Sequence, residues 1–134
     1  MREDCILVIR KGRGPYRGYL DLPGGGLEHG EAPEDAVVRE FREETGLVVT
    51  SLRLLGSYSN VVEGWPEGKH VSLHQIGFVY RVEAGTHGEI KSSPDGQDSL
   101  GAVWLPVGDL GRAAASPLVR RAWSLHESDG RCAS

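Results

Sequence analysis

Hydrophobic runs of strand length recur along the chain between segments rich in glycine, proline and polar residues. The first run, CILVIRK, is apolar at consecutive positions, which is typical of a strand buried on both faces. A second short run, YLDLP, must end at Pro23 and the three glycines that follow it. Three further strands are predicted, of which we expect the first two to pair: residues 52–62, 71–82 and 101–106.

Two segments carry helix signals instead. In APEDAVVREFREET, Pro33 suits the first turn, acidic residues favour the N-terminal end of the helix dipole, and Gly46 is placed to end the helix. The segment SPLVRRAWSLHES predicts a second helix over residues 116–127. Its apolar residues fall on one face: Leu118, Ala122 and Leu125. Few helices and several strands predict one compact α/β domain that spans residues 1–134.

Composition and charge are those of an ordinary globular domain. The chain has 134 residues, of which 39% are hydrophobic and 25% are charged. The net charge of −4 would not attract DNA or an anionic membrane, so we expect no nucleic-acid or membrane partner. An anionic ligand would need a local cation or a metal. Cys5 and Cys132 lie far apart without chelating neighbours, which indicates reduced thiols, and we expect a cytoplasmic protein.

Three glutamates crowd into the end of the first predicted helix. Residues three and four apart share a helix face, so Glu40, Glu43 and Glu44 would direct their carboxylates into one region. At about 4 Å, each like-charge pair is unfavourable by about 1 kcal/mol in water and about 4 kcal/mol near a protein surface. One interpretation is a solvated face on which Arg39 pairs with Glu43. The other is an oxygen-ligand site for a hard divalent cation.

The surrounding residues resemble the signature of the Nudix hydrolase family. That signature is a Gly, five residues, a Glu, seven residues, Arg-Glu, a bulky apolar residue, any residue, Glu-Glu, any residue, Gly and an apolar residue. In GGLEHGEAPEDAVVREFREETGL the fixed positions are filled without a gap by Gly25, Glu31, Arg39, Glu40, Phe41, Glu43, Glu44, Gly46 and Leu47. The resemblance extends loosely over most of the chain, and it implies an α/β/α sandwich with a mixed sheet between helices.

The resemblance also implies a metal site and the residues that form it. In the family this segment binds Mg²⁺ or Mn²⁺ through glutamates and a glycine carbonyl. By position the metal ligands are Glu40, Glu43, Glu44 and the carbonyl of Gly24. Arg39 would hold the glutamates in register, and Glu31 would brace the loop onto the helix. We therefore assign catalytic roles to Arg39, Glu43 and Glu44.

Two candidates lie outside this signature. Arg10 stands where family members often place a cation near the substrate phosphates, although a plain charge at the end of a strand is an equal alternative. Family members also often supply an acidic ligand or general base from the loop before the strand at 101–106. We choose Asp98 over Glu89 and Asp95 because it lies closest to the strand, with a solvated loop acid as the alternative.

Histidine and tryptophan residues give weaker signals. His70 and His74 would stand about 13 Å apart on a strand, too far to chelate one metal, and we interpret them as ordinary strand residues. Trp104 and Trp123 are predicted to lie in the core. Trp65 follows a glycine and precedes a proline in a turn, where contact with a base or a partner and a plain turn position are equal alternatives.

For the activity, the resemblance implies metal-dependent hydrolysis of a pyrophosphate linkage. ADP-ribose or another nucleoside diphosphate sugar is the first substrate hypothesis, and a nucleoside triphosphate, including an oxidised one, is the second. A domain that binds a nucleotide for regulation without hydrolysis is a third, although such domains usually lose the glutamates retained here. Many family members begin with a strand before the equivalent of residues 5–11, so we expect an open sheet edge that would favour a homodimer.

Overall fold

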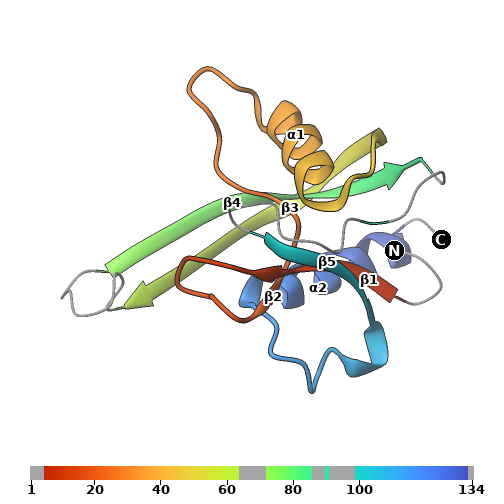
Figure 1. The fold of residues 1–134 in the computed structure, drawn as a ribbon. Helices are drawn as coiled ribbons and strands as arrows, with labels where there is room; N and C mark the ends of the chain where they lie inside the picture. Colours follow the sequence, from red (N-terminus) through yellow and green to blue (C-terminus); the bar gives the residue numbers. More distant parts are fainter. Residues whose placement is uncertain (1–4, 64–71, 86–89, 91–98, 133–134) are drawn as a thin grey trace.

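A three-stranded sheet lies at the centre of the computed structural model, which describes residues 5–63, 72–85, 90 and 99–132 (Figure 1). Its strands are β1 (Cys5–Lys11), β2 (Leu20–Asp21) and β5 (Ser99–Pro106). β1 lies between the other two and is antiparallel to both. A parallel bridge between Leu20 and Ala115 adds a further segment beside β2. The pairing is therefore mixed, as the resemblance implied.

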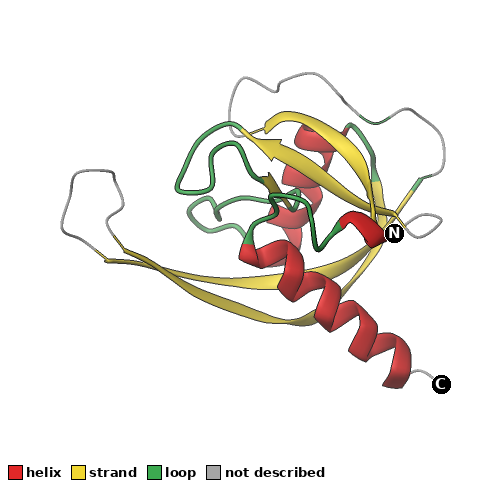
Figure 2. Ribbon diagram, turned by 90° about the horizontal axis from the view of Figure 1, so that it is seen from below, coloured by secondary structure: helices red, strands yellow, loops and turns green. Residues whose placement is uncertain are grey.

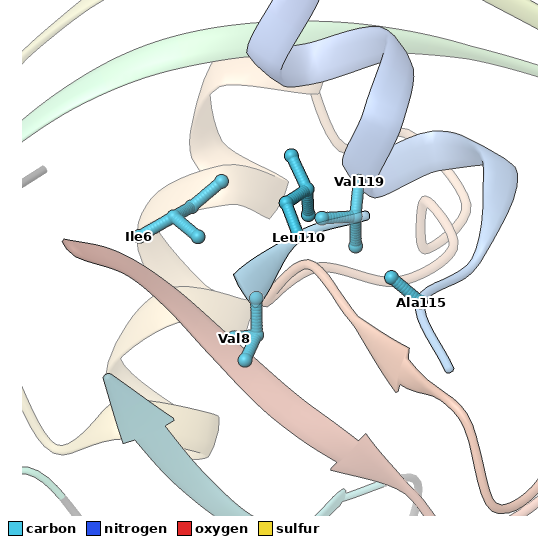
Figure 3. Packing of buried hydrophobic residues seen from close by; sticks show 5 residues of the cluster. All are labelled: Ile6, Val8, Leu110, Ala115 and Val119. Carbon is cyan, nitrogen blue, oxygen red and sulfur yellow. The ribbon is translucent and has the colours of Figure 1, made fainter. Parts of the chain in front are cut away.

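β1 is buried on both faces, which confirms the prediction from its unbroken apolar run. On one face the cluster consists of Ile6, Val8, Leu110, Ala115 and Val119 (Figure 3). On the other face it consists of Leu7, Ile9, Leu47 and Ala102. Helix α2 (Pro117–Cys132) supplies Val119 to the first cluster, and helix α1 (Pro33–Thr45) places Phe41 against the second. The helices thus cover opposite faces of the sheet, which gives the expected α/β/α sandwich (Figure 1).

A long antiparallel hairpin forms the second sheet. Its strands are β3 (Val49–Glu63) and β4 (Ser72–Ala84), whose register runs from Val49 opposite Ala84 to Glu63 opposite Ser72. The predicted pairing is therefore confirmed. His74 lies on this hairpin as an ordinary exposed strand residue, 2.8 Å from the hydroxyl of Ser59. Trp65 and His70 lie outside the described residues.

α1 has the predicted boundaries at both ends. Pro33 occupies its first turn, where a missing N–H leaves no helix hydrogen bond unmade. Gly46 ends the helix with φ of 79°, a left-handed conformation that favours glycine, and its N–H donates to the carbonyl of Arg42. In the part of the chain that the structure describes, neither helix is long and apolar enough to cross a membrane.

α2 runs beyond the predicted end near Glu127 because its last turns pack on the hairpin (Figure 2). Both carboxylate oxygens of Asp129 accept hydrogen bonds from the guanidinium of Arg53 on β3, and Arg81 on β4 lies 3.5 Å away. These bonds, that of Arg53 first, hold the pKa of Asp129 below its ordinary value. One turn earlier, Leu125 packs so closely on Gly56 that a Cβ there would lie 3.0 Å from it. Contacts with distant residues therefore set the length of this helix.

Candidate metal centre and adjoining cavity

Two buried glutamates of α1 face the glycine loop that follows β2. Glu40 and Glu44 lie one turn apart and are 9% and 1% exposed. The N–H of Gly24 donates a hydrogen bond of 2.8 Å to Glu44 Oε2. At Gly25, a Cβ would lie 2.6 Å from Glu40 Oε1, closer than such atoms approach, so glycine lets the loop reach the carboxylate. Loop and helix therefore meet around two carboxylates.

Arg39 connects the loop to the helix. Its Nε and one terminal nitrogen donate to the two oxygens of Glu31 at 2.9 and 2.8 Å, and its other terminal nitrogen donates to Glu40 Oε1 at 2.7 Å. It also donates to the carbonyl of Gly26 at 3.2 Å. The hydrogen bonds from Arg39, followed by one from a backbone N–H, lower the pKa of Glu31 to about 2. The bracing roles expected for Arg39 and Glu31 match this geometry.

Negative charge exceeds positive charge around Arg39. This arginine forms ion pairs with four glutamates: Glu28, Glu31, Glu40 and Glu43. One guanidinium carries a single positive charge, and the buried Glu44 adds a further carboxylate one turn from Glu40. A divalent cation would offset this excess, and carboxylate and carbonyl oxygens are the ligands that Mg²⁺ and Mn²⁺ prefer. The donor set therefore fits the metal that the sequence predicts.

The three predicted glutamate ligands do not form a ready ligand cluster. Among the described residues, no three His, Cys, Asp or Glu side chains gather closely enough to hold a metal ion. Glu40 is hydrogen bonded to Arg39 and Glu44 to Gly24, while Glu43 is 45% exposed and lies 3.6 Å from Arg39. The shared region expected from helical spacing is thus formed by Glu40 and Glu44, with Glu43 at its rim. Metal binding requires the carboxylates to exchange these hydrogen bonds for metal contacts.

The structure places the other sequence candidates with different outcomes. Trp104 and Trp123 pack against the two core clusters, as predicted. Arg10 is exposed at the end of β1, and its contact with substrate phosphates stays a prediction. Asp98, like its alternatives in the same loop, lies outside the described residues, so its role also stays a prediction.

A cavity of about 1070 Å³ adjoins the candidate metal centre. Its wall includes the glycine loop at Gly24 and contributions from both sheets and both helices. Polar residues that sequence reasoning did not select also line it: Lys11, Tyr16, Asp21, Tyr58 and Ser116. The position of Lys11 next to Arg10 was a signal that could have found it. Sequence offers no comparable signal for Asp21 and Ser116, which meet across a long separation in the chain.

Fold and site define an α/β/α sandwich in which an acidic helix packs on a glycine loop beside a large cavity. The NUDIX domain description matches residues 1–125. The chain belongs to the Nudix family.

Individual relatives agree with this family. The crystal structure of a MutT NUDIX hydrolase from Burkholderia pseudomallei has a TM-score of 0.74 at 28% identity, over 93% of this chain and 90% of that one. An ADP-ribose pyrophosphatase of Methanocaldococcus jannaschii is 38% identical over 98 residues, which are 73% of this chain and 54% of that protein. The uncharacterized Nudix hydrolase YvcI of Bacillus subtilis is 29% identical over 115 residues, 86% of this chain and 66% of that protein. The chain thus spans 54% and 66% of the lengths of these two curated relatives.

Proposed function

We propose that this chain is a metal-dependent pyrophosphohydrolase that cleaves the diphosphate linkage of a nucleoside diphosphate joined to another group. The observation that carries the proposal is the fit of the Gly24–Gly25 loop against the buried carboxylates of Glu40 and Glu44. The complete signature from Gly25 to Leu47 supports it, as does the family of the chain.

Glu40, Glu43, Glu44 and the carbonyl of Gly24 are the proposed ligands for Mg²⁺ or Mn²⁺. A divalent cation bound there would polarise phosphoryl oxygens, lower the pKa of a bound water and neutralise the leaving phosphate. The chain's own contribution is to fix the ligands, because Gly24 holds Glu44 and Arg39 holds Glu40. A carboxylate accepts the proton of the attacking water, and Asp98 is the residue we predict for this step.

ADP-ribose, or a related nucleoside diphosphate sugar, is the proposed substrate. The similarity to the ADP-ribose pyrophosphatase of M. jannaschii supports this class. The cavity of about 1070 Å³ lies at the upper end of the range of about 300–1,000 Å³ that is usual for ligand sites. It is therefore large enough for a nucleotide with an attached sugar.

The test is a panel of ADP-ribose, nucleoside diphosphate sugars and nucleoside triphosphates, assayed with Mg²⁺ by nucleotide and phosphate release. Chelation with EDTA should abolish hydrolysis, and Glu44→Gln should lower kcat by about a hundredfold or more while the fold is retained. Glu34→Gln is the matched control, since the same change on the same helix affects a carboxylate that bonds to Tyr80. Hydrolysis that is insensitive to EDTA, or a Glu44→Gln variant with near-normal turnover, would contradict the assignment.

A further inference from the structure

A group of polar side chains forms one part of the cavity wall, separate from the candidate metal ligands. We call it the recognition cluster and define it as Lys11, Tyr16, Asp21, Tyr58 and Asn60. Four of these residues line the cavity, and Asn60 joins them through a hydrogen bond of 2.6 Å from its side-chain amide to Tyr16 Oη. The cluster unites β1, the loop after it, β2 and β3. Asp21 lies three positions before Gly24, so the cluster adjoins the glycine loop.

The centre of the recognition cluster is a buried carboxylate. Asp21 is 9% exposed, and its Oδ1 accepts hydrogen bonds from the N–H of Leu22 at 2.9 Å and from the hydroxyl of Ser116 at 2.7 Å. Its Oδ2 lies 3.9 Å from Nζ of Lys11, a distance longer than a hydrogen bond. One oxygen is thus committed to holding the fold together, while the other forms a loose ion pair at the cavity wall.

Two phenols adjoin this ion pair. Burial, followed by the proximity of Tyr16 and Asp21, raises the pKa of Tyr58 to about 12. Tyr58 therefore keeps its proton at neutral pH and is a hydrogen-bond donor as well as an acceptor. Tyr16 accepts from Asn60 and retains its own O–H for donation. The cavity wall consequently offers an anionic acceptor, a cationic donor and two hydroxyls.

We propose that the recognition cluster binds a vicinal diol of the substrate, in which one hydroxyl donates to Asp21 Oδ2 and accepts from Lys11 Nζ. A hydroxyl suits the gap of 3.9 Å because it donates and accepts at the same time, so that both ions gain a hydrogen bond. A carboxylate that accepts from ribose hydroxyls is an established way to recognise that sugar. The inference rests on the proposed function and makes its substrate class narrower, since it favours ribonucleotides and ribose conjugates over deoxyribonucleotides.

Other polar groups of a nucleotide fit this wall less well. A phosphate would be repelled by the carboxylate of Asp21 at the position where Lys11 would attract it. A nucleobase edge presents donors and acceptors at fixed positions, and a ring atom that donates to Asp21 cannot also accept from Lys11. A sugar hydroxyl meets both requirements with one atom.

The experiment compares three probes: ADP-ribose, its analogue without the 2′-hydroxyl of the adenosine ribose, and its analogue without the 2-hydroxyl of the terminal ribose. For each probe kcat/KM is measured with Mg²⁺, and the dissociation constant is measured by calorimetry. We expect the wild-type protein to discriminate against one of the two deoxy analogues by about 10- to 100-fold, the effect of one hydrogen bond to a charged group.

Asp21→Asn and Lys11→Met are the test variants. Asn conserves the shape but places an amide donor toward Lys11, so we expect the discrimination ratio to fall to about one in both variants, even where activity is low. Ser116→Ala is the control, because it removes only the bond to Oδ1. It should lower the melting temperature and retain the ratio. If Asp21→Asn fails to fold, Lys11→Met alone decides the outcome.

The possible results separate this inference from the proposed function. Hydrolysis of all three probes with equal efficiency would overturn the diol site and leave the activity intact. Discrimination in binding without any hydrolysis would overturn the activity and leave the diol site intact. A ratio that persists in both test variants would overturn the assignment of the cluster, and failure to bind or hydrolyse any probe would overturn both proposals.

Discussion

Replacing Gly25 by alanine would place one methyl group between the glycine loop and the candidate metal centre. The new Cβ would lie 2.6 Å from Oε1 and 2.7 Å from Cδ of Glu40, so one of the two must move. The loop backbone is held by Gly24, whose N–H bonds to Glu44, and by the carbonyl of Gly26, which accepts from Arg39. The carboxylate of Glu40 ends a flexible side chain and is the part that yields. It then loses its bond of 2.7 Å to Arg39.

The effects on stability and on metal binding should therefore differ. Inserting a methyl group into a packed site destabilises by about 1–3 kcal/mol. The lower entropy of the unfolded alanine chain returns about 0.4–1 kcal/mol, since no unusual backbone angle is required at Gly25. We expect a net loss of about 1 kcal/mol in the free energy of unfolding. Displacement of a ligand should lower metal affinity by about 10- to 100-fold, the range seen when the supports of a metal ligand are removed.

Calorimetric titration with Mn²⁺ and urea denaturation would measure these two quantities on the same samples. Gly26→Ala is the matched control, because a Cβ at Gly26 has no atom within 4 Å and should change neither quantity. If Gly25→Ala binds Mn²⁺ as tightly as the wild-type protein, Glu40 is not a ligand whose position depends on this loop. If both alanine variants lose affinity equally, flexibility of the loop rather than contact with Glu40 is responsible.

Two further predictions concern pH and helix ending. The pKa of Glu31 is about 2 in the folded chain, against 4.5 ordinarily, so its pairing with Arg39 contributes stability above pH 4.5 that is lost as the pH falls toward 2. Glu31→Gln should therefore show a flatter decline of melting temperature over that interval by scanning calorimetry, and parallel curves would disprove this. Gly46→Ala should destabilise by about 1 kcal/mol in urea denaturation because φ is 79°, and Gly46→Asn by less. Equal stability of Gly46→Ala and the wild-type protein would contradict the role of this cap.

The elements that sequence predicted best are those whose signals are local. The apolar run of β1 indicated burial on both faces without knowledge of its partners. Pro33 and Gly46 marked the ends of α1 because each satisfies a backbone requirement at its own position. The spacing of the signature likewise located the loop and helix of the candidate metal centre. These features depend on neighbours within a few positions in the chain.

The features that sequence could not predict depend on distant contacts or on side-chain rotation. Helical spacing places Glu40, Glu43 and Glu44 near one face, but competition from Arg39 and Gly24 decides where each carboxylate points. The recognition cluster is a long-range feature as well. A register irregularity lies between Ile9 and Lys11 on β1, so simple strand alternation does not fix the direction of Lys11.

The place of β1 in the sheet also constrains the order in which the protein folds. β1 lies near the start of the chain, yet its longest pairing is with β5, in which Cys5 lies opposite Pro106 and Ile9 opposite Ala102. During synthesis the central strand therefore waits for residues made about a hundred positions later, while only the short β2 can pair with it early. Closing so long a loop is entropically unfavourable before its contacts form, which predicts slow folding for this part of the chain. The hairpin of β3 and β4 can form in the interval, so the two sheets should acquire their structure at different stages.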